Sequence, residues 1–275
     1  MANIYTDTNV LRYLGIAFAK TSLPEDIRNR MVLAPLTLLE LASQLGTGGA
    51  EEAFAALRIL RRTHDAKSAG MWLLPWPDDF FRALFNLPPD EDKITAALTS
   101  LVLNIWSAAK AVDLKEDGKE ARNLWDETTE GLARVFSEAV DVLRSKGSPP
   151  KAEHKRDLCR GIAHRSRIDE TKIDVDLLAV SLDAYYIFNN HLFQVALQNK
   201  NYNFNKNRND HIDAELLIYL ADPRLHLLTG DQDFRRVTGS SQASRVHIAS
   251  QACIKDPECV TRELRNILET AAAAA

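Results

Sequence analysis

A chain of 275 residues with 45% hydrophobic and 26% charged side chains is long enough to bury a sizeable core and has the composition of a folded globular protein. Its 34 Lys and Arg residues against 38 Asp and Glu residues give a formal net charge of −4, which excludes a polycation that coats nucleic acid over its whole surface. Three cysteines, at positions 159, 253 and 259, lack the spacing of a zinc site and the even number of a disulfide framework. With no secretion signal in the first residues, we expect a reducing, cytoplasmic compartment.

Strand patterns and helix patterns alternate at both ends of the chain. Toward the N-terminus, the sequence predicts strands at 3–6, 31–34 and 71–74 and helices at 9–20, 36–45 and 50–62. Toward the C-terminus, it predicts a helix at 211–220, strands at 225–229 and 245–248, and a closing helix at 257–270. Repeated strand–helix alternation predicts an α/β fold with a parallel sheet and helices on its faces.

The middle of the chain has a different pattern. Apolar residues recur at helical spacing from about 80 to 205, as in Leu132, Phe136, Ala139 and Leu143, and strand signals are scarce. We therefore expect a discontinuous α/β core, formed by residues 1–80 and 205–275, and an all-helical insertion at 81–204. The most membrane-like stretch, 94–112, carries polar side chains between its apolar ones, which predicts a buried helix and no membrane partner.

Four acidic residues stand at the ends of the predicted elements. Asp7 follows the first strand, Glu40 opens the helix after the second, Asp213 lies in the first turn of the late helix, and Asp231 follows the strand that ends at Thr229. Because such points converge at one edge of a parallel sheet, we expect the four carboxylates to meet. Two carboxylates 4 Å apart repel by about 4 kcal/mol at an effective dielectric near 20, so the group calls for a compensating cation. An all-oxygen site suits Mg²⁺ or Mn²⁺.

The segments around these acids resemble those of the PIN-domain nucleases. The resemblance rests on Asp7-Thr8-Asn9-Val10-Leu11, Thr37-Leu38-Leu39-Glu40-Leu41, Asp213-Ala214-Glu215-Leu216 and Thr229-Gly230-Asp231-Gln232-Asp233-Phe234. It covers roughly residues 1–80 and 205–250, and the order and spacing of the segments are more specific than any one of them. A PIN-like parallel-sheet core with a long helical insertion is the fold that it implies.

The resemblance also implies an activity, which is metal-dependent endonucleolytic hydrolysis of phosphodiester bonds, usually in RNA, by a metal-activated water. Asp7, Glu40, Asp213 and Asp231 would be the catalytic and metal-binding acids, and Asn9 and Thr229 would support them. Asp210, one helical turn before Asp213, and Asp233 are candidate additional ligands. The insertion, which compact toxin nucleases lack, is a candidate surface for a protein partner or an antitoxin.

Two local groups of residues are candidates for binding the substrate. One is a basic run in the insertion with Lys151, Lys155, Arg156, Arg160, Arg165 and Arg167, together with His154 and His164. The other is the polar loop 199–208, in which Lys200, Tyr202, Lys206 and Arg208 combine cations with an aromatic ring. Unpaired bases can stack on aromatic rings, which favours single-stranded RNA, with single-stranded DNA as the other substrate. Both groups have a plain alternative as solvated surface segments.

Each acid also has a structural interpretation. Asp7 is a candidate N-cap, Thr37 and Glu40 fit a capping box, Asp210 is a candidate cap for the late helix, and Asp231 and Asp233 fit ordinary turns. Two further functions stay open. A haloacid-dehalogenase-like phosphohydrolase would use Asp7 as a nucleophile, although that chemistry wants a second acid where Asn9 stands. A noncatalytic binding or regulatory module would keep the fold without the reaction.

Overall fold

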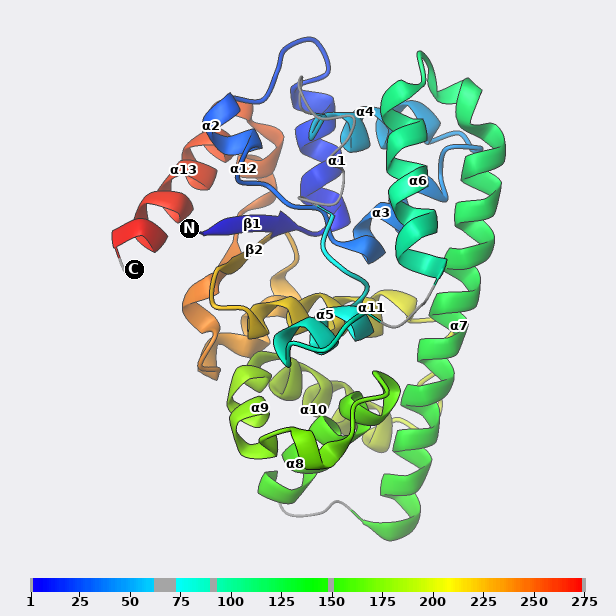
Figure 1. The fold of residues 1–275 in the computed structure, drawn as a ribbon, viewed down its shortest axis with the longest axis vertical. Helices are drawn as coiled ribbons and strands as arrows, with labels where there is room; N and C mark the ends of the chain where they lie inside the picture. The colour runs from blue at the N-terminus through cyan, green and yellow to red at the C-terminus, as the bar shows by residue number, and fades with distance from the viewer. Residues whose placement is uncertain (1, 62–72, 90–92, 148–150, 274–275) are drawn as a thin grey trace.

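A computed structural model describes residues 2–61, 73–89, 93–147 and 151–273 of the chain (Figure 1). Its α-helices and strands follow one another as β1 (Asn3–Thr6), α1 (Thr8–Ala17), α2 (Glu25–Arg28), α3 (Pro35–Ala42), α4 (Ala50–Arg58), α5 (Pro77–Leu84), α6 (Lys93–Ser107), α7 (Lys115–Lys146), α8 (Lys151–Arg165), α9 (Val175–Ser181), α10 (Asp183–Gln198), α11 (Arg208–Leu216), β2 (Leu225–Thr229), β3 (Val246–Ile248), α12 (Gln251–Lys255) and α13 (Pro257–Ala273). Short 3-10 helices are η2 (Ala111–Leu114), η3 (Glu170–Lys172), η4 (Leu217–Ala221), η5 (Gln232–Gly239) and η6 (Ala243–Arg245).

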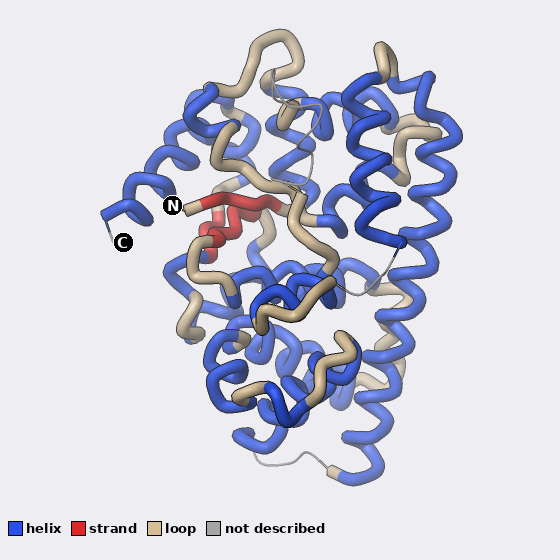
Figure 2. The backbone as a smooth tube through the Cα atoms, viewed as in Figure 1, coloured by secondary structure: helices blue, strands red, loops and turns tan. Residues whose placement is uncertain are grey.

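The sheet has three parallel strands in the order β1-β2-β3, seen in red in Figure 2. Asn3 pairs with Leu225 at one end of the β1 and β2 ladder, and Thr229 pairs with Ile248 at the end of the β2 and β3 ladder. All five residues of β2 are buried, as expected for the central strand of a parallel sheet that helices cover. The predicted α/β class with a parallel sheet is therefore confirmed, and the bounds of β1 and β2 match the sequence prediction.

The other two predicted strands, at 31–34 and 71–74, are wrong as strands within the described residues. Single parallel bridges join Ile4 to Met31 and Leu33 to Leu73, and residues 71 and 72 lie outside the described residues. The segment at 31–34 still lies beside β1, since the Val32 amide donates to the Ile4 carbonyl at 2.8 Å, and the Leu74 amide in turn donates to the Leu33 carbonyl at 2.9 Å. Pro35 begins α3 directly after the segment at 31–34, which leaves too little extended chain for a longer ladder.

The segment from α6 to α10 is helical, as predicted, and packs against the sheet-bearing part of the chain. The 32-residue helix α7 runs along one side of the molecule, contacts α3 near one end, and contacts α10 and α11 further along (Figure 1). Buried residues of α7 and α10, such as Phe136 and Phe188, belong to the same hydrophobic cluster as Tyr5 of β1. Both parts of the chain therefore contribute to one hydrophobic cluster.

Helix α6 contains most of the stretch at 94–112 that was predicted to be a buried helix. Leu98, Val102 and Ile105 of this helix are buried against the rest of the protein. Over the described ranges, none of the helices combines the length and the apolar character that crossing a bilayer requires.

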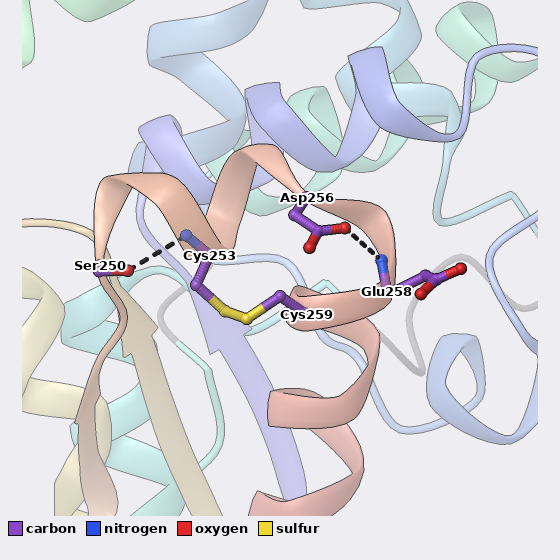
Figure 3. Close-up of a disulfide and its surroundings, with 5 residues drawn as sticks. All are labelled: Ser250, Cys253, Asp256, Glu258 and Cys259. Atoms are coloured by element: carbon purple, nitrogen blue, oxygen red, sulfur yellow. Dashed lines mark hydrogen bonds between the residues drawn. A yellow bond between two sulfur atoms is a disulfide. The ribbon is translucent and has the colours of Figure 1, made fainter.

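A disulfide joins Cys253 of α12 to Cys259 of α13 (Figure 3). The turn between the two helices brings the cysteines together: Ser250 caps α12 by accepting from the Cys253 amide at 3.1 Å, and the Asp256 carboxylate accepts from the Glu258 amide at 3.0 Å. We expected no disulfide framework because the number of cysteines is odd, and that expectation missed this local bridge. Disulfides are rare in cytosolic proteins, so the cysteines give no support to a reducing compartment.

Candidate functional site

Asp7 joins the end of β1 to the start of α1 and to the end of β2. As the N-cap of α1, its carboxylate accepts from the Val10 amide at 2.7 Å, which confirms the capping interpretation. The same carboxylate accepts from the Gly230 amide at 3.1 Å and from the Thr229 hydroxyl. Burial raises the pKa of Asp7, and these three hydrogen bonds oppose that effect. Capping and membership of the acidic site are therefore compatible roles.

Glu40 reaches the site from α3. Its carboxylate accepts a hydrogen bond from the Thr8 hydroxyl of α1. Burial raises the pKa of Glu40, while the positive charge of Arg12 acts in the opposite direction. The predicted capping box of Thr37 and Glu40 is wrong, because α3 begins two residues earlier, at Pro35, and the Thr37 hydroxyl donates to the Thr6 carbonyl at 3.2 Å.

Asp213 has the most strongly perturbed carboxylate of the site. Burial is the largest cause, and the negative charges of Asp231, Asp7, Glu40 and Asp210 follow, together raising the pKa of Asp213 well above its ordinary value. None of these causes is a neighbouring cation. The carboxyl group is therefore held among other acids, where its charged form is costly.

Asp231 lies just after β2, as predicted, and is fixed by the turn that begins there. Its amide donates to the Thr229 hydroxyl at 2.9 Å, and its carboxylate accepts from the Asp233 amide at 2.8 Å as the N-cap of η5. Thr229 thus bonds both Asp7 and Asp231, which agrees with its predicted supporting role.

The structure brings together the four acids that the sequence singled out. We call Asp7, Glu40, Asp213 and Asp231 the acidic quartet; their elements are the β1–α1 junction, α3, α11 and the β2–η5 junction. Carboxylates whose charges raise the pKa of a common neighbour, Asp213, fit a divalent cation by charge and by donor type, since hard cations prefer oxygen. Among the described residues, however, no three His, Cys, Asp or Glu side chains have their donor atoms arranged around one ion position.

The two candidate additional ligands both have other partners. Asp210 accepts a hydrogen bond from the Tyr202 hydroxyl, and Asp233 forms an ion pair with Arg236 at 2.8 Å. Asp210 still lies close enough to raise the pKa of Asp213. Asn9, predicted to support the acids, is exposed on the first turn of α1.

Four cations of the basic run have acidic partners. Lys155 pairs with Asp183, Arg156 with Asp176, Arg160 with Asp157, and Arg165 with Asp78 and Glu215. Arg165 donates to both carboxylate oxygens of Glu215, at 3.1 and 2.9 Å, and the Glu215 side chain is only 2% exposed. The prediction that Arg165 binds nucleic acid is therefore better replaced by a role in a buried ion pair.

The loop at 199–208 is only partly available to a substrate. The Tyr202 ring packs edge-on against buried Phe204, with ring centroids 4.8 Å apart, and Arg208 pairs with Asp126 at 2.9 Å. Lys200 and Lys206 are exposed, and neither forms an ion pair with another described residue. These two lysines keep their predicted role as candidate contacts for nucleic acid.

Sequence reasoning missed three side chains that border the acids. Arg12 of α1 lies beside Glu40, and Arg236 of η5 and His191 of α10 lie beside Asp233 and Asp210. Arg12 could have been found from its position one helical turn after Thr8. His191 could not, because nothing in the sequence indicates which face of α10 meets η5.

Two cavities bordered by described side chains have no acid of the quartet in their linings. One of about 790 Å³ lies between α7, α8 and α10, and one of about 700 Å³ is bordered by α2, α4, α6 and the loop between α1 and α2. No family model matches the chain, and no curated protein or solved structure matches it.

Proposed function

We propose that this protein is a PIN-like, metal-dependent endoribonuclease that hydrolyses phosphodiester bonds of single-stranded RNA. The observation that carries the proposal is the meeting of the acidic quartet, whose members come from four separate segments of the chain and raise the pKa of Asp213. Four independent helix caps and turns would have no reason to gather at one place. Mg²⁺ or Mn²⁺ is the cofactor that such an oxygen-rich, anionic site suits.

Each acid has a distinct part in the proposed reaction. Asp7, Asp213 and Asp231 would hold the cation, which supplies an activated water and neutralises charge on the phosphoryl oxygens. Glu40, held by the Thr8 hydroxyl, would orient the attacking water or bind the cation. The Thr229 hydroxyl and the Gly230 amide fix the Asp7 carboxylate, so that this ligand is positioned before substrate arrives. No covalent intermediate on the enzyme is needed.

A noncatalytic binding module is the second candidate. One observation favours it: in the described chain, no three metal-ligating side chains surround a common ion position. Such a protein would bind RNA or a protein partner, with the helices α6 to α10 as a candidate surface, and would hydrolyse nothing. The haloacid-dehalogenase-like alternative has less support, because both oxygens of Asp7 accept hydrogen bonds and Asn9 is exposed.

Cleavage of defined substrates separates these functions. Labelled single-stranded RNA, single-stranded DNA and a phosphate monoester would be incubated with the protein in Mn²⁺, in Mg²⁺ or in EDTA, beside the variants Asp7→Asn and Asp213→Asn. Asp141→Asn, which alters an exposed carboxylate of α7, is the matched control.

The nuclease proposal predicts RNA cleavage that requires the metal, is lost at least about 100-fold in both site variants and persists in the control. Turnover of the monoester alone would favour the phosphohydrolase. Binding of RNA without cleavage under any metal condition would overturn the proposal in favour of the binding module.

A further inference from the structure

Two side-chain hydrogen bonds join α1 to α3 and to the turn that follows α3. The Thr8 hydroxyl donates to Glu40 of α3, and the Arg12 guanidinium donates to the amide oxygen of Gln44, in the turn, at 3.0 Å. Within α1, Arg12 lies four residues after Thr8, which is about 6 Å of rise. Arg12 is therefore held one helical turn along α1 from the residue that bonds Glu40, at the edge of the site.

The charge of Arg12 is not neutralised by a salt bridge in the described part of the chain. Its hydrogen-bond partner, Gln44, is neutral, and Arg12 is half-buried. Arg165, which is half-buried as well, pairs with two carboxylates. A fixed guanidinium with unused N–H donors beside an anionic site is suited to a phosphate, which guanidinium can bind through two oxygens.

We propose that Arg12 binds a phosphate of the RNA strand next to the scissile bond, and so holds the substrate against the repulsion of the quartet. This inference rests on the proposed function, since it assigns the substrate path at the same site. The Gln44 amide limits the motion of the guanidinium, which lowers the entropic cost of binding the phosphate. Phosphate contacts of this kind fix the register of a nucleic acid strand without reading its sequence.

Binding of a fluorescein-labelled oligouridine, measured by anisotropy in EDTA over a series of salt concentrations, tests the inference without turnover. The variants are Arg12→Met, which removes the charge, and Arg12→Lys, which keeps it. Arg262→Met is the control, because Arg262 is an exposed arginine of α13, which lies beside the start of β1 and away from α3 (Figure 1).

We expect Arg12→Met to weaken binding about 5- to 10-fold and to reduce the slope of log K against log salt by about 0.7, the value for one phosphate contact on a single strand. Arg12→Lys should keep the slope and lose affinity about 2- to 3-fold, because lysine binds a phosphate as a point charge. Should Arg12→Met not fold, Gln44→Ala provides the second test, with an expected loss of about 2- to 3-fold. The inference would be overturned if Arg12→Met bound the oligouridine with the affinity and the salt dependence of the wild type. It would also be overturned if both Arg12→Lys and Gln44→Ala did so.

Kinetics distinguish this failure from failure of the proposed function. For cleavage in Mn²⁺, Arg12→Met should raise KM about tenfold with kcat nearly unchanged. If the wild type cleaves RNA and Arg12→Met has the same KM, the role of Arg12 is overturned and the nuclease function stands. Binding that depends on Arg12, in a protein that cleaves no RNA, would overturn the nuclease function and leave Arg12 as a phosphate contact.

Discussion

Gly230 donates its backbone amide to the Asp7 carboxylate at 3.1 Å, across 223 positions of sequence. This bond ties the turn after β2 to the first turn of α1, where the central strand and its neighbour end. It places Asp231, which follows Gly230 directly, near Asp7, which precedes α1. The position also leaves little room: a Cβ on Gly230 would lie 2.9 Å from the end of the Ile254 side chain.

Thr229 supports two acids at once, so its hydroxyl should matter to stability. Thr229→Val keeps the shape of the side chain and removes the hydrogen bonds to Asp7 and from the Asp231 amide. We expect a loss of about 1–3 kcal/mol in the free energy of unfolding, measured in urea, because buried polar groups lose their partners. Thr47→Val removes an exposed hydroxyl that donates to the Gln44 carbonyl, and it should change the free energy of unfolding by less than about 0.5 kcal/mol. Equal effects in the two variants would contradict the role of Thr229.

The pH dependence of stability should report the crowding of the acids. The pKa of Asp213 is raised in the folded state, so this group favours folding while it is protonated, and that contribution is lost as pH rises through its folded pKa. In EDTA at pH 8, Asp213→Asn should therefore be more stable than the wild type by about 1–2 kcal/mol. Near pH 4 the difference should largely disappear. An Asp213→Asn variant that is less stable at pH 8 would show that a cation of the protein already compensates the charge.

The ion pair between Arg165 and Glu215 should be structural. Among the described residues, Arg165→Met leaves the buried Glu215 carboxylate with the Tyr185 hydroxyl as its remaining hydrogen-bond donor, and should destabilise the protein by about 3–5 kcal/mol. The double change with Glu215→Gln should recover much of this loss. Arg156→Met, which breaks an exposed pair with Asp176, should cost less than about 1 kcal/mol. A single Arg165→Met variant of wild-type stability, with weaker RNA binding, would restore the original prediction of a nucleic-acid contact.

The close approach of α1 to α4 depends on Gly15. A Cβ added there would lie 2.4 Å from backbone atoms of Ala56, so Gly15→Ala should destabilise the protein by about 1–3 kcal/mol as the helices separate. At Gly131, in the middle of α7, the added Cβ has nothing within 4 Å, and Gly131→Ala should stabilise by about 0.5–1 kcal/mol. Calorimetric melting of both variants measures the contrast, and a neutral Gly15→Ala would contradict this packing.

Much of the sheet and of the acidic quartet could be predicted from sequence, because short apolar strands and the acids that follow them are local signals. The bridges at Met31 and Leu33 could not be told from strands, since their shortness depends on where α3 begins. The pairing of Cys253 with Cys259 depends on the turn between two helices, which no spacing motif encodes.

The surroundings of the quartet were harder to predict, because they depend on tertiary packing. The cations of α8 look like a nucleic-acid patch in sequence, but α9, α5 and α11 supply the acids that pair with them. Arg12 is the opposite case, since nothing in the sequence distinguishes it from other arginines of helices. Only the structure shows that its hydrogen-bond partner, Gln44, is an amide and not an acid.

Binding of Mn²⁺ to the metal-free protein, followed by electron paramagnetic resonance, tests most directly whether the acidic quartet is a metal centre. We predict a site in the wild type that is lost or weakened at least about tenfold in Asp213→Asn and is unchanged in Asp141→Asn. Saturation to ten times Kd should raise the melting temperature of the wild type by about 3–6 °C. Equal Mn²⁺ affinity in the wild type and in Asp213→Asn, or no binding by the wild type at millimolar Mn²⁺, would contradict the account.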